Sequence, residues 1–267
     1  LVTNRIESRF SALKAQNKTA LVAYLVAGDP SLKASLTAMH CMVEAGVDII
    51  EVGVPFSDPS AEGPSIQRGH ERALANKVGL RTIFQLIADF RKTDATTPIV
   101  LMGYTNPIEW MSIESFAEQA QHAGVDGVLT VDLPPEEAES YTSVFKQHGL
   151  VNIFLIAPTT SDARMQSIAD VASGFVYYVS LKGVTGSAKL DVAEVKTRVE
   201  SINQCSGLPV CVGFGIKNAE AAAAVAKYAD GVVIGSAIVD LMSQCQSEED
   251  VVQRLKPYLS EIRQAID

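Results

Sequence analysis

The feature that most constrains this chain is a regular alternation of short apolar runs with segments of helical periodicity. The apolar runs are rich in Val and Ile and occupy residues 20–26, 48–54, 99–104, 127–131, 152–156, 175–180, 209–213 and 231–234. Most of them do not alternate apolar with polar residues, which is typical of strands covered on both faces. The pattern therefore predicts parallel strands joined by helices.

Segments with helical periodicity separate these runs. We expect helices at residues 4–15, 32–44, 80–91, 113–122, 136–147, 163–171, 192–202 and 219–227, and a helical region at the C-terminal end. Two architectures fit eight such units, an open doubly wound sheet and a closed eight-stranded barrel.

A weak internal repeat favours the barrel. The tetrapeptide Ala-Gly-Val-Asp ends a predicted helix and opens a strand at residues 45–48 and again at 123–126, and Ala229-Asp230-Gly231 has a similar place. One turn used three times suggests one unit repeated around a ring. The length of 267 residues also suits such a barrel, and no Pro- or Ser-rich linker divides the chain. We therefore predict that residues 1–267 form a single α/β domain, a (β/α)8 TIM barrel with an extra N-terminal helix.

Composition excludes several classes of function. A net charge of -9 disfavours nucleic acid as a partner, because its phosphates would be repelled. No apolar stretch reaches the roughly 18 residues of a membrane span. The four cysteines show no C-x-x-C spacing and the four histidines no H-x-x-x-H pair, so we expect reduced thiols, no metal site and a cytoplasmic protein.

One carboxylate stands inside a predicted strand. Ile49, Glu51 and Gly53 share one face of this strand. If that face is the barrel interior, Glu51 lies in an apolar pocket, where burial raises a carboxyl pKa and suits the group to proton transfer. The alternative is an outward glutamate paired with a helix residue. Apolar neighbours on both faces and the lack of an adjacent cation favour the first interpretation.

Three further groups follow predicted strands, where the active sites of barrels lie. The loop at residues 55–67 carries Asp58 and Glu62, although an ordinary solvated loop would look similar. The segment at residues 180–190, with Gly183 and Gly186, suggests a lid, or simply a long flexible loop. The glycine-containing turns at residues 213–215 and 235–236 suggest a phosphate site, or tight turns alone.

Six segments together resemble the alpha subunit of tryptophan synthase. They are VGVPFSDPSAEGPSIQ (52–67), LMGYTNP (101–107), GVDGVLTVDLPPEE (124–137), GFVYYVSLKGVTG (174–186), VGFGI (212–216) and GVVIGSAIV (231–239). The resemblance implies a lyase of tryptophan biosynthesis that cleaves indole-3-glycerol phosphate to indole and glyceraldehyde 3-phosphate by a retro-aldol reaction. It implies no cofactor in this chain. It further implies a partner, a pyridoxal-phosphate-dependent beta subunit, in an alpha2beta2 heterotetramer.

The resemblance also assigns two catalytic carboxylates. Glu51 matches the family's strand glutamate, which moves a proton to the indole ring carbon and assists at the glycerol hydroxyl. Glu62 stands where the family has aspartate, and Ser60 stands where it has an apolar residue. The extra methylene could displace the carboxylate by about 1 Å, which can lower a rate on the order of a hundredfold. An alternative function is therefore a catalytically weakened barrel that acts mainly as an allosteric partner of the beta subunit.

The remaining family contacts carry over residue by residue. Thr185 matches the lid residue that hydrogen-bonds the second carboxylate. The positions that match the indole pocket are Tyr24, Tyr104, Leu129, Tyr177 and Phe214, and those that match the phosphate site are Gly186, Gly215, Gly235 and Ser236. The positions that match loops facing the beta subunit are Asp58, Pro59, Asn106 and Pro134.

Overall fold

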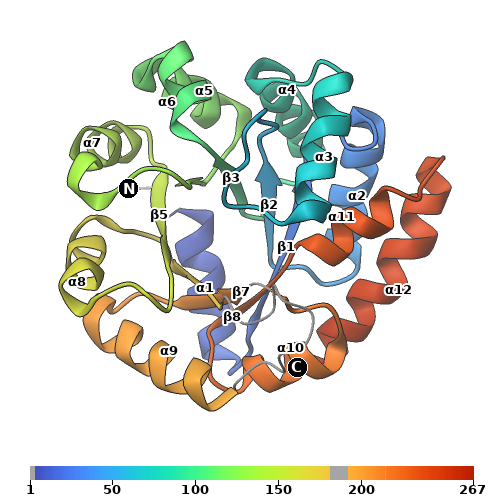
Figure 1. The fold of residues 1–267 in the computed structure, drawn as a ribbon. Helices are drawn as coiled ribbons and strands as arrows, with labels where there is room; N and C mark the ends of the chain where they lie inside the picture. The colour runs from blue at the N-terminus through green and yellow to red at the C-terminus, as the bar shows by residue number, and fades with distance from the viewer. Residues whose placement is uncertain (1–3, 181–191, 214) are drawn as a thin grey trace.

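The computed structural model is a closed barrel of parallel strands with helices around it (Figure 1). It describes residues 4–180, 192–213 and 215–267. Each strand pairs with the next, and β8 returns to β1, which confirms the predicted barrel and excludes an open sheet. The strands are β1 (Ala20–Val26), β2 (Ile49–Gly53), β3 (Ile99–Gly103), β4 (Gly127–Thr130), β5 (Val151–Ile156), β6 (Val176–Val179), β7 (Val210–Gly213) and β8 (Gly231–Ile234).

Most predicted helices are present, and the N-terminal helix α1 is confirmed. The helices near their predicted places are α1 (Arg5–Ala15), α2 (Leu32–Glu44), α4 (Leu80–Arg91), α6 (Ile113–Ala123), α7 (Glu139–Gln147), α8 (Asp162–Val171), α9 (Val192–Ser206) and α10 (Ala219–Ala226). The C-terminal region forms α11 (Ser236–Met242) and α12 (Glu248–Ile266). Within the described part of the chain, no helix is both long and apolar enough to cross a membrane.

The structure corrects the sequence analysis in two connections. The loop expected to run to residue 67 ends at Gly63, because α3 (Pro64–Ala75) begins at Pro64. Proline is well suited to the first helical position, where its missing N–H is not needed. A short helix, α5 (Thr105–Met111), follows β3 and contains Asn106, which was expected on a loop. A 3-10 turn, η1 (Pro135–Glu137), precedes α7.

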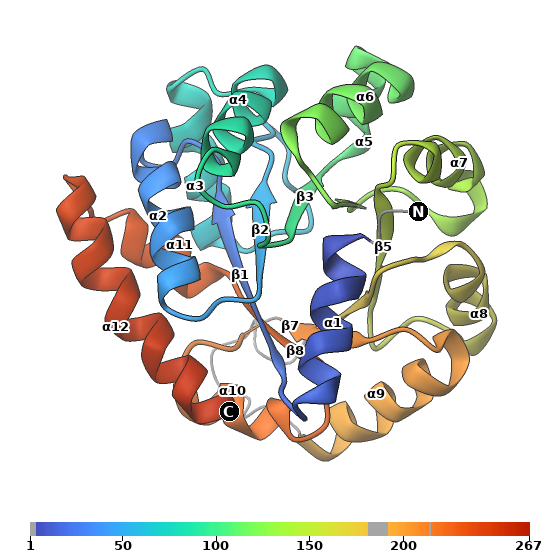
Figure 2. The same cartoon turned by 180° about the vertical axis from the view of Figure 1, so that it is seen from behind.

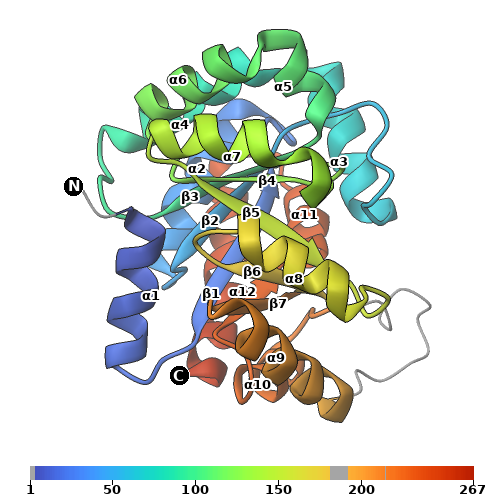
Figure 3. The same cartoon turned by 90° about the vertical axis from the view of Figure 1, so that its left-hand side faces the viewer.

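The core has two layers that follow the alternation along each strand. On β2, Ile49 belongs to the cluster inside the barrel, whereas Ile50 and Val52 belong to the cluster between strands and helices. Helix α1 lies across the mouth formed by the amino ends of the strands (Figures 2 and 3). Its Phe10 ring lies 5.7 Å from the Phe175 ring, centroid to centroid, and closes this mouth with apolar side chains. The opposite mouth is left for the loops that follow the strands.

The repeated aspartate has a structural explanation. Asp48 accepts a hydrogen bond from the Leu21 N–H at 2.9 Å, and Asp126 accepts one from the Ile99 N–H at 2.8 Å. Asp230 accepts one in the same way from the backbone N–H at position 210, at 2.8 Å. Each aspartate therefore satisfies a backbone donor of the preceding strand, at the mouth that α1 covers.

Candidate active site

Glu51 lies inside the barrel, as the first of the two interpretations predicts. It is 1% exposed, and its charge acts on Tyr177 and Cys211 of the strands across the interior. Burial, with a smaller contribution from Glu62, raises the pKa of Glu51 to about 8. Its Oε1 atom has no hydrogen-bond partner among the described residues. At neutral pH this side chain is therefore mainly a neutral acid that faces the interior with an unused oxygen.

Two tyrosines point into the same interior, and each is accommodated by a glycine of the next strand. Tyr24 of β1 lies over Gly53 of β2, and Tyr177 of β6 lies over Gly213 of β7. A Cβ atom at either glycine would overlap the tyrosine hydroxyl. Tyr24 is the register partner of Glu51, and burial together with the charges of the two glutamates raises its pKa. The two phenols thus form polar walls near the strand ends.

Glu62 is held at the same mouth by the loop between β2 and α3. It is 8% exposed, and its carboxylate accepts a hydrogen bond from the Tyr104 hydroxyl. That hydroxyl also accepts a hydrogen bond from the Ala61 N–H at 3.2 Å, and the Tyr104 ring stacks on Phe56 at 4.9 Å. Burial raises the pKa of Glu62, and the Tyr104 hydrogen bond opposes that rise. The longer side chain is therefore buried and fixed at one oxygen, whereas Ser60 is exposed.

A cavity of about 160 Å³ lies beyond the ends of β6, β7 and β8. It brings together four residues singled out from the sequence: Tyr177, Gly215, Gly235 and Ser236. Gly215 adopts a left-handed backbone with a φ of +79°, and Ser236 begins α11, where the first N–H groups have no acceptor within the helix. Lys217 is another residue that lines this cavity. Backbone groups at the ends of β7 and β8 thus border a small space, with a lysine in its lining.

The other predicted residues are placed less directly. Leu129 of β4 is fully buried in the cluster inside the barrel, so it packs in the interior core. Thr185, Gly186 and Phe214 lie outside the described residues, as do Gly183 and the rest of the lid expected beyond residue 180.

Two residues near these groups were not predicted from the sequence. His70 of α3 is 2% exposed and contacts Tyr24, but with no helix predicted at α3 there was no reason to place it there. Lys217 follows the second glycine of the 213–215 turn, and its position just past that turn was the available signal.

Known proteins are similar in sequence to almost the whole length of this chain. A family model described as "Tryptophan synthase alpha chain" matches residues 10–267. A tryptophan synthase alpha chain of Thiobacillus denitrificans is 53% identical over 264 residues, which cover 99% of this chain and 96% of that one. The chain belongs to this family. The resemblance seen in the sequence is confirmed, and with it the lyase reaction of the tryptophan synthase alpha chain, the cleavage of indole-3-glycerol phosphate in tryptophan biosynthesis.

Solved structures of the tryptophan synthase family agree with the fold. The alpha subunit from Legionella pneumophila is 45% identical, with a TM-score of 0.93 over 100% of this chain and 99% of that chain. A tryptophan synthase from Mycobacterium tuberculosis, in its aminoacrylate-bound form, is 34% identical, with a TM-score of 0.88 over 99% of this chain and 100% of that chain. The eight-stranded barrel is therefore the family's own architecture.

The residues expected to face a beta subunit follow three neighbouring strands, β2, β3 and β4, on one side of the open mouth. Asp58 and Asn106 are exposed after β2 and β3, and Pro59 and Pro134 are partly exposed. Among the described residues, no group of three His, Cys, Asp or Glu side chains is placed to hold a metal ion. The four cysteines, all within the described ranges, are free thiols.

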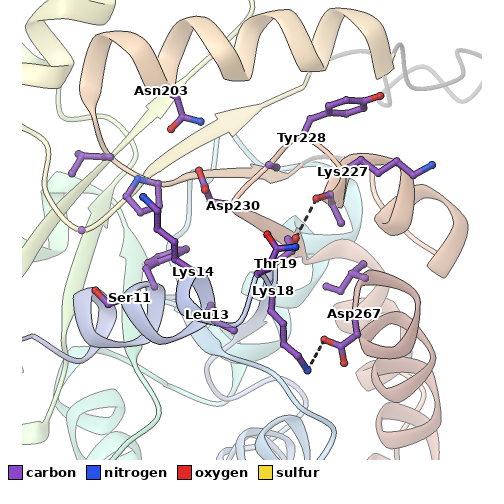
Figure 4. A pocket seen from close by; sticks show the side chains of 18 of the residues that line it. Ser11, Leu13, Lys14, Lys18, Thr19, Asn203, Lys227, Tyr228, Asp230 and Asp267 are labelled. Carbon is purple, nitrogen blue, oxygen red and sulfur yellow. Dashed lines mark hydrogen bonds and ion pairs between the residues drawn. The ribbon is translucent and has the colours of Figure 1, made fainter.

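A larger hollow, about 900 Å³, lies at the opposite end of the barrel (Figure 4). Lys14, Lys18, Tyr228 and Asp230 line it, and Lys18 forms an ion pair with Asp267 at 3.1 Å. It is an open groove between α1 and the loops before β7 and β8, and neither Glu51 nor Glu62 lines it. Size alone therefore does not identify the site; the buried acids do.

Proposed function

We propose that this chain cleaves indole-3-glycerol phosphate with Glu51 as the proton-transfer group and Glu62 as the group that stabilises charge on the indole nitrogen. The observation that carries this proposal is the Glu51 carboxyl, which is buried in the interior, has a raised pKa and has an Oε1 that no described residue hydrogen-bonds. A buried carboxyl that is neutral near pH 7 is suited to donate a proton.

The reaction needs one proton moved between two places on the substrate. Neutral Glu51 gives its proton to the indole ring carbon that carries the glycerol chain, which leaves positive charge spread to the ring nitrogen. The bond between that carbon and the glycerol chain then breaks, and the glycerol hydroxyl loses its proton to the Glu51 carboxylate as it becomes an aldehyde. Indole and glyceraldehyde 3-phosphate are formed, and Glu51 is again neutral.

Glu62 supports this step from the side of the ring nitrogen. In the proposal one carboxylate oxygen of Glu62 accepts the indole N–H, while the Tyr104 hydroxyl holds the other oxygen. A carboxylate there stabilises the positive charge that develops on the ring. Tyr24, Tyr104, Leu129 and Tyr177, with Phe214, would form the apolar surroundings of the indole.

The phosphate is proposed to bind at the cavity beyond β6, β7 and β8. Backbone N–H groups at a helix start bind phosphate without any need for a net positive chain. Gly215, Gly235 and Ser236 line this cavity, and Gly186 is proposed to join them. Thr185 is proposed to hydrogen-bond Glu62 when a substrate is bound. This arrangement puts the phosphate at the rim and the indole deeper in the barrel.

A beta subunit that uses pyridoxal phosphate is the proposed partner, in a cytoplasmic alpha2beta2 complex. The proposed contacts are Asp58, Pro59, Asn106 and Pro134. One further observation supports them: Trp110, one turn after Asn106 on α5, is 83% exposed. A large exposed aromatic side chain is typical of a binding surface.

The partner proposal is tested by titrating a beta-type subunit with two matched variants. Trp110→Ala should weaken the complex about tenfold, whereas Tyr228→Ala, which removes an exposed aromatic ring at the opposite end, should not. Equal affinity of the two variants would contradict the proposed surface.

The catalytic proposal is tested by mixing the chain with indole-3-glycerol phosphate, with and without a beta subunit, and assaying indole. The wild-type chain should release indole and Glu51→Gln should not. The Glu62 and Ser60 departures favour one alternative, a weakened barrel that serves its partner. Normal stimulation of the beta subunit without indole release from the wild-type chain would support that alternative.

A further inference from the structure

His70 is a buried histidine that the proposed reaction does not use. It lies on α3, is 2% exposed, and shares the inner face of this helix with Ile66 and Ala73. Its Nδ1 atom lies 3.0 Å from the Phe56 backbone nitrogen, and its Nε2 atom lies 3.4 Å from the Tyr24 hydroxyl oxygen. One imidazole thus contacts both the loop after β2 and a side chain of β1.

These two contacts fix the tautomer of the ring. A backbone N–H only donates, so Nδ1 must accept the hydrogen bond from Phe56 with its lone pair. Burial lowers the pKa of His70 to about 4, so the ring is neutral at physiological pH and carries its single proton on Nε2. That N–H therefore donates to the Tyr24 hydroxyl oxygen. The Tyr24 proton is consequently free to point away from α3.

Each contact leads to one of the two glutamates. Tyr24 is the register partner of Glu51 on the neighbouring strand. Phe56 stacks on Tyr104, whose hydroxyl is hydrogen-bonded to Glu62. The imidazole therefore contacts one residue in the surroundings of each acid: Tyr24 near Glu51, and Phe56 near Glu62.

Helix α3 is itself fixed firmly enough to hold the ring in place. Arg72 forms two hydrogen bonds of 2.7 Å with the buried Asp29 carboxylate. Gly69 lets the helix approach closely, because a Cβ atom there would come within 3.0 Å of Asp29 Oδ2. The Gln67 side chain donates to the Glu62 carbonyl oxygen at 2.9 Å. The same helix thus anchors the loop that carries Glu62.

We propose that His70 is a positioning residue that orients the Tyr24 hydroxyl beside Glu51. It also fixes the backbone of Phe56, whose ring stacks on the tyrosine that is hydrogen-bonded to Glu62. This inference rests on the proposed function of the two glutamates. By donating to Tyr24, the imidazole directs the tyrosine's own proton into the barrel interior, where the substrate and Glu51 would meet it. A histidine that only packed in the core would stabilise the fold, but it would not orient the Tyr24 proton for the chemical step.

Two substitutions separate the two hydrogen bonds. The amide of His70→Asn takes the place of Nδ1 and can still accept from Phe56, but it does not reach Tyr24. The longer amide of His70→Gln takes the place of Nε2 and can still donate to Tyr24. We expect His70→Asn to lower kcat about tenfold with KM changed less than about twofold, and His70→Gln to recover most of kcat. His148→Asn, at the end of α7, is the matched control and should leave both constants unchanged.

A double-mutant cycle tests the coupling to Tyr24 directly. In a Tyr24→Phe background, His70→Asn should lower kcat no further, because the hydroxyl that it orients is already absent. Wild-type kcat in His70→Asn, or multiplicative losses in the double variant, would overturn the proposal. A kcat loss in both His70 variants that matches their loss of folded protein, measured by circular dichroism, would also overturn it. Activity retained in Glu51→Gln would instead refute the catalytic assignment, whatever His70 does.

Discussion

The two mouths of this barrel bury carboxylates in opposite ways. At the mouth covered by α1, Asp126 lies 2.8 Å from Arg5 and 3.0 Å from Arg91, and Asp48 lies 2.8 Å from Arg263. Both also accept backbone N–H groups of neighbouring strands. At the open mouth, Glu51 is equally buried and has no cation partner in the described parts of the chain.

This contrast shows that a buried carboxyl group can stabilise the fold or take part in proton transfer, depending on its partners. Pairing and hydrogen bonding keep a buried carboxylate charged and join the elements around it. Without a partner, burial favours the neutral form and leaves a proton available for transfer. The comparison predicts that acids at the two mouths respond oppositely to substitution, in activity and in stability.

The largest effect is expected for Glu51→Gln. Indole release should fall about 10³-fold, because the amide cannot transfer a proton. The folded protein should at the same time become more stable at pH 8, by on the order of a few kcal/mol, because a raised carboxyl pKa penalises the folded state there. Steady-state indole assays and denaturant unfolding at pH 8 measure both. A destabilised variant would mean that Glu51 has a structural partner after all.

The opposite result is expected for Asp126→Ala. Loss of the Asp126 carboxylate leaves Arg91, whose side chain is 10% exposed, without its closest carboxylate. It also leaves the Ile99 N–H without an acceptor. The free energy of unfolding should fall by about 3 kcal/mol. The kcat of the remaining folded protein should stay within about twofold of wild type. Urea unfolding and a rate corrected for folded fraction test this; an unchanged unfolding midpoint would refute the structural role.

The pH dependence follows from the raised pKa of Glu51. The proposed reaction needs the protonated form, so kcat/KM should fall about tenfold per pH unit above pH 8. The free energy of unfolding should also fall as pH rises. As pH rises from about 4.5 to 8, the unfolded chain releases this proton while the folded chain keeps it, so stability falls across that window. Glu51→Gln should lack this fall, which denaturant titrations across the window would show.

The smallest effect is expected for Tyr104→Phe. Loss of the hydroxyl removes the hydrogen bond that lowers the pKa of Glu62, so that pKa should rise further. The acidic limb of kcat/KM should therefore move to higher pH, with a loss of several-fold on the acidic side of the profile. Tyr141→Phe, which removes the hydroxyl bonded to Glu109 outside the barrel, is the matched control. Identical pH profiles for the two variants would contradict the link between Tyr104 and Glu62.

Much of the fold could be predicted from the sequence, because the apolar runs give the strands directly. The repeated turn ending in Asp48 and Asp126 indicated the ring, and the structure shows why it recurs: each aspartate satisfies the same kind of backbone donor. Helix α3 was missed because Pro64 and Gly63 suggest a loop until their place at a helix start is known.

The site could be predicted only in part, because its contacts join distant positions. The parity of β2 put Ile49, Glu51 and Gly53 on one face, and the apolar neighbours and the lack of an adjacent cation favoured the interior for that face. The contact between Glu62 and Tyr104 spans 42 positions, and that between Tyr24 and His70 spans 46. Periodicity says nothing about such pairs, since they depend on how a loop and a helix pack over neighbouring strands. His70 was therefore beyond reach until α3 was placed.

The glycines beneath the two tyrosines restrict how this sequence can change over evolutionary time. Alanine at position 53 or 213 would be tolerated only after the tyrosine of the neighbouring strand had shrunk or moved. Substitutions at Tyr24 and Gly53 are therefore tied to each other, as are those at Tyr177 and Gly213. A library that varies Gly53 or Gly213 alone would sample mostly chains in which the new side chain overlaps the tyrosine, whereas one that varies both members together would explore new shapes for the pocket.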